Sequence, residues 1–450
     1  MARGGATEQA AKTPFRDVFA VAEFRALWMA QLLSVVGDQL ARVALTVLVY
    51  DRTRSALLAA ITFVVSIVPT FIGGVTLAWV ADRYPRRGVM IACDIARCAL
   101  VLVMAIAGMP LAALVVLLFV VTLVGAPFTA ARAAIYPDVL TGDRYVMGTA
   151  VTLTTYQFAQ VLGFAAGGTL VGFFGTRTSL LLDAATFAGS AIIVRAWVRP
   201  HAAPATLGAH REPSRPAGIV AGARLVLARP ALRWPLLFGL LAAFYAVPEG
   251  VAAPLAHDVG GGAAATGVIL AADALGQCTG AIMLSRFVAP PTRLRVMGPL
   301  AVAACAVLVL FFAQPSLAGC LLVLVASGLC ASYQVAANAA FVSATPRDQR
   351  SQAFGLAQGG LSLGQGTAMI LAGAAAQHYA PARVIAVFGA AGAVVALAIA
   401  IGWARSWSAD QQTPLVQCGV QPQLDSRMTL PSCVVAVGGG GEFSPSSTRA

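Results

Sequence analysis

The sequence GGVTLAWVADRYPRR, residues 73–87, joins the end of a long apolar run to a short basic segment. The apolar run covers residues 55–81, and a second apolar run, residues 88–109, follows Arg87 directly. The hydrocarbon core of a bilayer is crossed by about 20 predominantly apolar helical residues. These two runs therefore predict two membrane spans joined by a charged loop.

The composition extends this interpretation to the whole chain. Of its 450 residues, 59% are hydrophobic and only 11% are charged, and the mean hydropathy is +0.81. Soluble domains carry about 25% charged residues. So few charges cannot cover the surface of a soluble protein of this size. We therefore expect a multi-pass membrane protein surrounded by the lipid bilayer, and not an enzyme.

Apolar runs of spanning length occur twelve times, six in each half of the chain. They are residues 27–50, 55–81, 88–109, 111–134, 147–173 and 178–198, followed by 232–256, 263–285, 294–313, 316–343, 351–378 and 381–404. Open strands would leave backbone groups unpaired in lipid, so each run is predicted to be a helix. The predicted fold class is an all-α membrane protein with twelve transmembrane helices in two pseudo-symmetric six-helix bundles.

A weak internal repeat supports the division into two halves. A shift of 206 residues places AARAA, residues 130–134, on AANAA, residues 336–340, and Arg144 on Arg350. Both copies fall on the fourth helix and the following loop of their half, as two parallel repeats require. The predicted domains are a cytoplasmic leader (1–26), an N-terminal bundle (27–198), a cytoplasmic linker (199–231), a C-terminal bundle (232–404) and a disordered cytoplasmic tail (405–450).

The basic residues predict the orientation. With the amino terminus inside, 21 arginine and lysine residues fall on the cytoplasmic side and four on the outside. Cytoplasmic loops carry such an excess. We therefore expect both termini to lie in the cytoplasm and the chain to lie in a bacterial cytoplasmic membrane.

The counts also argue against several kinds of chemistry. The net charge of +12 comes from arginines between apolar runs, so nucleic acid is not expected as a partner. The single lysine, Lys12, does not follow a glycine, so no phosphate-binding loop for ATP is present. The eight cysteines and four histidines lack ligand spacing, so we expect no metal and no cofactor. An ion gradient would have to supply the energy.

Residues 73–87 resemble the signature between helices two and three of the major facilitator superfamily. LSVVGD (33–38), ACDIAR (92–97) and FVSATPRDQR (341–350) are similar to the bacterial drug and siderophore exporter branch, which includes enterobactin and macrolide exporters. The resemblance covers residues 15–405 and implies secondary active transport by alternating access. It also implies a small-molecule substrate, protons as the coupling ion and a monomer.

Three positions differ from the pattern of that branch. Ala78 stands where a glycine is usual, and Thr122 occupies the position of the arginine of helix four in many proton-coupled exporters. The helix-five motif Gly-Pro-x-x-Gly-Gly is GFAAGG here, residues 163–168. Within it, Gly163, Gly167 and Gly168 permit close helix packing, either as a sliding surface between the halves or as ordinary tight contacts.

Charged residues inside the apolar runs are the candidate coupling or cavity residues. A charge at the bilayer centre costs about 2.5–3.5 kcal/mol on the scale derived from membrane insertion, which gives the lowest values. Each charged residue in these runs is therefore expected to have a structural or functional role. Asp38 and Arg42 share one face of the first helix. Asp38 is predicted to bind and release a proton with Arg42 tuning its acidity, or else to form an ion pair with a neighbouring helix. Asp273 and Glu249 are the corresponding cavity residues of the second half.

A second set of charged residues lies toward the cytoplasmic side. Asp82, Arg83, Arg86 and Arg87 are predicted to form a cytoplasmic gate, with a plain role in topology as the alternative. Asp94 and Arg97 are expected to complete the charge network around Asp82. Asp183 is interpreted as structural.

Together these features predict a proton-coupled exporter of small amphipathic or cationic organic molecules. An importer or facilitator of a metabolite on the same fold is the first alternative. A non-transporting membrane receptor is the second, and it requires a centre without water.

Overall fold

The computed structural model describes residues 15–77, 79–200, 229–345 and 350–412, and in these residues the chain forms helices and no strand. The leader up to residue 14, linker residues 201–228 and the tail from residue 413 lie outside the described residues, so the predictions for them stay predictions. Both bundles belong to one compact unit that ends at Ser406.

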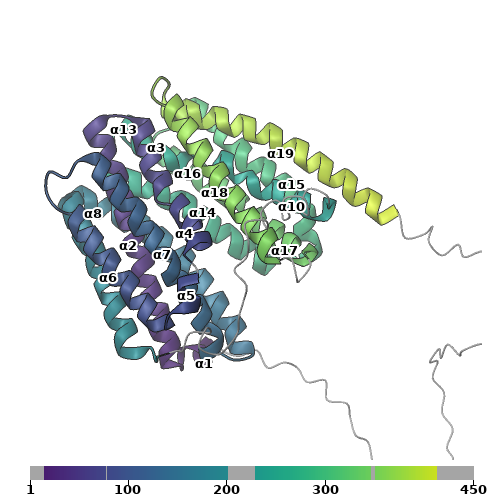
Figure 1. Cartoon of the computed structure of the whole chain (residues 1–450). Coiled ribbons are helices and arrows are strands. Elements are labelled where there is room, and N and C mark those ends of the chain that lie inside the picture. Colours follow the sequence, from purple (N-terminus) through teal and green to yellow (C-terminus); the bar gives the residue numbers. More distant parts are fainter. Residues whose placement is uncertain (1–14, 78, 201–228, 346–349, 413–450) are drawn as a thin grey trace, which may run out of the picture. The chain divides into compact units, whose positions relative to one another are not determined.

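The first bundle contains one very long helix and one span that is divided into three short helices (Figure 1). A short helix, α1 (Phe15–Phe19), precedes it. Its members are α2 (Ala22–Thr53), α3 (Ala56–Val65), α4 (Val68–Thr76), α5 (Trp79–Arg83), α6 (Arg86–Met104), α7 (Leu111–Val139) and α8 (Asp143–Trp197).

The second bundle starts with a span that is broken into four pieces. Its members are α10 (Pro230–Leu240), α11 (Ala242–Tyr245), α12 (Val247–Gly250), α13 (Ala252–Asp258), α14 (Ala263–Phe287), α15 (Pro290–Ala306), η2 (Val307–Ala313), α16 (Leu317–Ala331), α17 (Tyr333–Ala344), α18 (Arg350–Ala375) and α19 (Pro381–Gln412).

All twelve predicted runs are helical. Nine helical stretches within the described residues are long and apolar enough to cross a membrane. One of them is α8, whose 55 residues contain two of the predicted runs. Gly175 separates these runs with φ of 78° and ψ of 169°, a conformation outside the helical region. We call residues 143–174 the first arm of α8 and residues 176–197 the second arm. The remaining two runs form α6, which carries charges, and α18. The predicted fold class is confirmed.

Proline explains where two spans are interrupted. Pro69 lies at the start of α4, and Pro248 lies at the start of α12. A proline lacks the backbone N–H and clashes with the preceding turn, so the helix breaks there. These breaks free backbone carbonyls inside the bundle, where a side chain must satisfy them.

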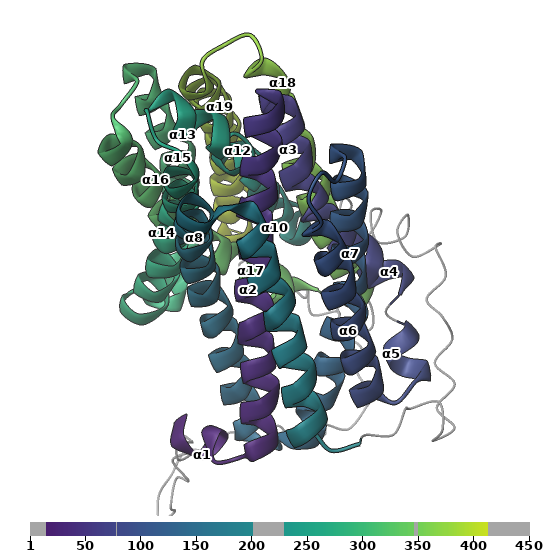
Figure 2. The same ribbon diagram turned by 90° about the vertical axis from the view of Figure 1, so that its left-hand side faces the viewer.

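The two halves touch along helices α8 and α14 and along helices α3 and α18. Figure 2 shows the first pair side by side, and Figure 1 shows the second. At the first contact, a Cβ built on Gly168 would lie 2.6 Å from the carbonyl oxygen of Ala263 and from the Cα of Gly267. The other two glycines of the helix-five motif, Gly163 and Gly167, instead face α2 of their own half. Of the three glycines of this motif, Gly168 is therefore the one that lies against the backbone of the other half.

We expect Gly168→Ala to destabilise the protein by about 1–3 kcal/mol, since the added methyl group meets backbone that cannot move aside. Gly172 lies one turn later on the same helix, and a Cβ there would make an ordinary 3.7 Å contact with Ala264. Gly172→Ala is therefore the matched control and should be neutral or slightly stabilising, because alanine favours helix over glycine. Thermal unfolding of both purified variants in one detergent compares them. Equal stability would contradict the close approach.

Candidate functional site

The interior of the described bundles encloses more carboxylates than bases. The acidic residues come from five helices, which are α2, α6, α8, α12 and α14. The carboxylates are those of Asp38, Asp94, Asp183, Glu249 and Asp273, and the guanidinium groups beside them are those of Arg42 and Arg97.

Arg97 on α6 joins three helices of the first half. Its Nη2 forms an ion pair with Oδ1 of Asp38 on α2, and its Nη1 donates to Oγ of Ser34 at 3.0 Å. The guanidinium carbon lies 4.0 Å from the ring centroid of Phe187, on the second arm of α8. The Arg97 side chain is 4% exposed, whereas that of Asp38 is 36% exposed. The cation is thus buried, whereas part of the carboxylate is exposed.

Arg42 forms no ion pair with Asp38 within the described residues. Its Nη2 donates instead to the backbone carbonyl of Ser66 at 3.2 Å, in the break between α3 and α4. In a continuous helix the N–H of Thr70 would bond to that carbonyl, but here it bonds to the carbonyl of Ile67. Arg42 therefore satisfies a carbonyl that the break leaves free. The rings of Phe63 and Phe164 lie beside its guanidinium group.

The predicted network of Asp94 and Arg97 with Asp82 is not formed. Asp94 accepts a hydrogen bond from Oγ of Ser190 at 2.6 Å, and Arg97 is engaged with Asp38. The physical reason is distance along the helix. Asp94 lies eight residues beyond the start of α6, which is about 12 Å at the rise of an α-helix, and so lies inside the bundle.

Asp183, on the second arm of α8, is fully buried. Neither oxygen of its carboxyl group has a hydrogen-bond partner within the described residues. It lies within electrostatic range of Asp38 and Arg97. The first half therefore carries three neighbouring carboxylates and one guanidinium group.

Of the two enclosed acidic residues of the second half, Glu249 lies near a charge of the first half. Asp273 on α14 is buried and accepts a hydrogen bond from Nε2 of Gln277 at 2.6 Å. Glu249 follows the helix break at Pro248 and lies within electrostatic range of both Asp273 and Arg42. Because Arg42 belongs to the first half, the charges of the two halves meet at this point.

The charged residues at the end of α5 and the start of α6 differ in their contacts. Those of α6 are bonded to other helices, whereas those of α5 are exposed. Arg86 forms an ion pair with Asp138 at 2.7 Å and donates to the carbonyl of Ala134, and Arg87 donates to the carbonyl of Arg195. Asp82 and Arg83 are exposed and make no ion pair with another described residue.

A pocket of about 500 Å³, which includes space open to solvent, lies between α10, α17 and α18 of the second half. Its walls include Phe341 and Phe354, whose rings pack edge to face at 5.6 Å. Its polar lining consists of the carboxamides of Gln334, Asn338 and Gln358, and no titratable side chain lines it. Gln334 already donates to the hydroxyl of Tyr245 at 2.8 Å, whereas Asn338 and Gln358 are exposed.

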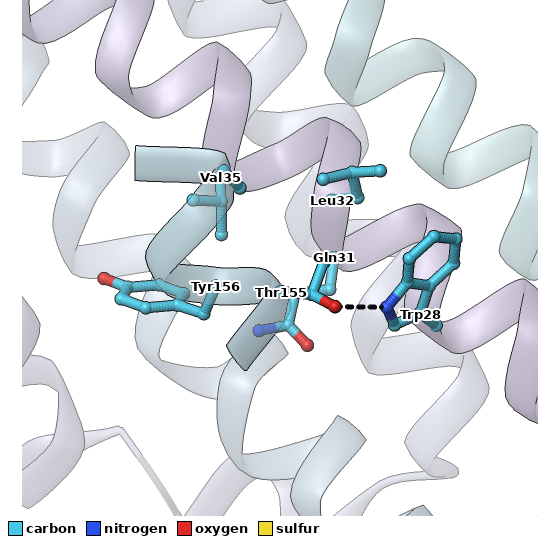
Figure 3. Close-up of a pocket in the computed structure, with 7 residues that line it drawn as sticks. Trp28, Gln31, Leu32, Val35, Thr155 and Tyr156 are labelled. Carbon is cyan, nitrogen blue, oxygen red and sulfur yellow. Dashed lines mark hydrogen bonds between the residues drawn. The ribbon is translucent and has the colours of Figure 1, made fainter. Parts of the chain in front are cut away.

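A smaller pocket, of about 160 Å³, lies between α2 and the first arm of α8 (Figure 3). The indole N–H of Trp28 donates to Oγ1 of Thr155 at 2.9 Å, and the ring of Tyr156 lies on the opposite side of Thr155. The pocket thus combines aromatic rings with Gln31, one of the polar residues inside the predicted spans.

Two six-helix bundles with broken helices and charges enclosed between them define a multi-pass membrane transporter built from two halves. The model of the Major Facilitator Superfamily matches residues 27–248 and 249–415. The chain therefore belongs to the Major Facilitator Superfamily and is a transmembrane transporter of small molecules.

Solved structures of transporters share this fold at low sequence identity. The nucleoside transporter NupG is 15% identical with a TM-score of 0.64, and the alignment covers 84% of this chain and 99% of that one. A bacterial homologue of the human lysosomal transporter Spinster is 17% identical with a TM-score of 0.63, over 89% and 99% of the two chains. A POT family transporter in complex with 5-aminolevulinic acid is 12% identical with a TM-score of 0.67, over 85% and 96%. No curated protein sequence matches the chain.

Sequence reasoning found most of the interior charges but missed how they pair. It did not single out Gln277, and it interpreted Asp183 as structural. The available signal was that Asp183 is an acid within an apolar run without a basic residue one turn away, whereas Asp38 has Arg42 at that spacing. The partner of Arg97 could not be found from spacing, because Asp38 is 59 residues away.

We expect Asp38→Asn and Arg97→Gln each to destabilise the protein by about 3–5 kcal/mol, since each leaves a charge of opposite sign without its partner. The double variant should recover most of that loss. The free energy of unfolding of the four proteins, measured in one detergent, gives the coupling between the two side chains. Additive losses in the double variant would show that the two groups do not form an ion pair.

Proposed function

We propose that this protein is a proton-coupled exporter of small amphipathic organic molecules, such as drugs, secondary metabolites or siderophores. It would lie in a bacterial cytoplasmic membrane as a monomer with both termini inside. Residues 27–198 and 232–404 would rock against each other to open a central cavity alternately to the two sides. The carboxylates of Asp38, Glu249 and Asp273 carry the proposal, because an enclosed acid changes its charge when it binds a proton.

Protons are an adequate energy source. One proton moving down a potential of 100 mV yields about 2.3 kcal/mol. One unit of pH adds about 1.4 kcal/mol. Together these could sustain a several-hundred-fold gradient of substrate for each proton.

The larger pocket supports the proposed substrate class. The space that it offers to water-sized groups is about 90 Å³. Sites for small organic molecules measure about 300–1,000 Å³, so the lining of this pocket, and not its size, supports the proposal. Phe341 and Phe354 offer apolar contact, and Asn338 and Gln358 offer hydrogen bonds without charge. A molecule with a flat apolar part and a few polar groups suits this lining.

Contacts between the halves support a particular conformation. Nε2 of Gln377 donates to Oγ of Ser55 at 2.5 Å, and the rings of Tyr50 and His257 pack at 5.9 Å. All four residues lie at the end of the bundle that is outside if the termini are cytoplasmic. We call this set the outer seal and propose that the molecule is closed to the outside. The exposed Asp82 and Arg83 would then belong to an open cytoplasmic gate, which Arg86 and Arg87 anchor.

Facilitated transport or import is the second candidate function. It is favoured by Phe164, which replaces the proline of the exporter motif, and by Thr122 at the position of the helix-four arginine. A non-transporting receptor would need a dry centre. Cysteines placed at positions 38 and 273 should then escape water-soluble thiol reagents.

Everted membrane vesicles distinguish export from facilitation, with ethidium as the cationic probe and N-phenylnaphthylamine as the neutral one. In energised vesicles an exporter accumulates at least one probe in the lumen, and nigericin abolishes the accumulation because it collapses the pH gradient. Counterflow that nigericin leaves unchanged, without accumulation, would indicate a facilitator and would overturn the proposed coupling.

We expect Asp273→Asn to lose the nigericin-sensitive accumulation at least tenfold while retaining counterflow, because an amide cannot bind and release the proton. Asp143 is an exposed acid at the start of α8, and Asp143→Asn is the control, with accumulation like the parent protein. Accumulation by Asp273→Asn at the parent level would remove Asp273 from the coupling machinery.

A further inference from the structure

Three carboxylates surround one cation between α2, α6 and the second arm of α8. Arg97 lies in electrostatic range of Asp38, Asp94 and Asp183, and Asp183 lies in range of Asp38. We call these four residues the carboxylate cluster. Asp94 and Asp183 are completely buried and Arg97 nearly so, whereas Asp38 is partly exposed.

The cluster cannot be fully ionised in this arrangement. One guanidinium group beside three carboxylates leaves two negative charges in excess. An isolated ionised carboxylate in an apolar interior is so costly that the group binds a proton instead. The guanidinium of Arg97 is already engaged with Asp38 and Ser34. At least one of the two buried acids must therefore be neutral.

The groups that face Asp183 identify it as the neutral acid. From α2 it meets Asp38, and from α6 it meets Arg97 and the thiol of Cys98, so Arg97 supplies the positive charge. The nearby hydroxyl of Thr186 donates to the backbone carbonyl of Asp183 at 2.7 Å. Asp94 differs, because its carboxylate accepts a hydrogen bond from Ser190.

The carboxyl group of Asp183 fits against α2 because residue 37 is a glycine and has no side chain. A Cβ built on Gly37 would overlap Oδ1 of Asp183 and Oγ1 of Thr186. The carboxyl group therefore lies directly against the backbone of α2, one residue before Asp38. Burial on this scale leaves no room for the hydration that an anion would require.

We propose that Asp183 is a proton-binding site and carries a proton in this conformation. Asp38, the exposed member of the cluster, is the residue through which that proton exchanges with water. Proton coupling is the part of the proposed function on which this inference rests, and it holds for either direction of transport and for any substrate.

The exchange conserves charge within the cluster. The O–H bond of Asp183 breaks, and an O–H bond forms on the carboxylate of Asp38. Asp38 becomes neutral and releases Arg97, while Asp183 becomes the anion that Arg97 balances. Asp38 releases its proton to water in a second conformation, because in the present arrangement the cluster cannot hold all three carboxylates as anions.

Infrared spectroscopy of the full-length protein in lipid nanodiscs tests the proposal without any substrate. Protonated carboxyl groups absorb through their C=O stretch, which is separate from the bands of carboxylates. At pH 7 we expect Asp183→Asn to lose a distinct part of this absorption, and Asp51→Asn, an exposed acid at the end of α2, to lose none. An unchanged band in folded Asp183→Asn would overturn the proposal.

Thermal stability against pH provides the second measurement. An unfolded aspartate has lost its proton above about pH 3.9. The folded state then holds one more proton than the unfolded state, so the stability of the parent protein should fall as the pH rises above about 4. Asparagine resembles the neutral acid, so Asp183→Asn should fold and should show a weaker pH dependence. A variant that fails to fold, or that keeps the full pH dependence, would contradict a neutral Asp183.

Gly37→Ala provides an independent variant, because its methyl group takes the space of the Asp183 carboxyl group. It should shift or abolish the infrared band that Asp183→Asn removes. Gly189→Ala on the second arm of α8 is the matched control, since its Cβ would make a 3.6 Å contact with Leu33. If the infrared band of Asp183 is found but everted vesicles of the parent protein show no proton-driven accumulation, the proposed function is wrong and the proposed proton site remains.

Discussion

The cost of charge in an apolar interior governs the organisation of this protein. Arg97 is buried between α2, α6 and the second arm of α8, and its position depends on the carboxylate of Asp38. The low dielectric of such a site strengthens a paired charge and makes an unpaired one expensive. The interior residues lower this cost in three ways. Some charges form ion pairs, some acids are neutral, and some side chains remain partly exposed.

Broken helices extend the same constraint to the backbone. The interruption at Ser66 leaves a carbonyl that Arg42 satisfies, and the interruption at Pro248 brings Glu249 into range of Arg42. One guanidinium group of the first half therefore serves a backbone carbonyl of its own half and an acid of the other. Binding of a proton to Glu249 would weaken this attraction across the two halves, which is how a change of charge could favour a change of conformation.

The sequence was sufficient for the architecture because hydrocarbon thickness fixes the length of each span and the repeat fixes the halves. It was also sufficient to find Asp38, Glu249 and Asp273 as enclosed acids. The partners of these charged residues could not be predicted from the sequence. Asp38 and Arg42 share a helical face, yet the partner of Asp38 lies on α6, because a contact between helices depends on their packing and on the break at Ser66. The role of Gly37 likewise becomes visible only where α2 meets the second arm of α8.

The central claim is that transport requires the outer seal to open while the enclosed acids exchange protons. A disulfide between cysteines introduced at Ser55 and Gln377, in a chain without its eight native cysteines, tests it most directly, since these side chains already touch across the halves. Oxidation should stop accumulation of the probes in energised vesicles, and a reductant should restore it. Undiminished accumulation by the cross-linked protein would show that transport does not need the outer seal to open.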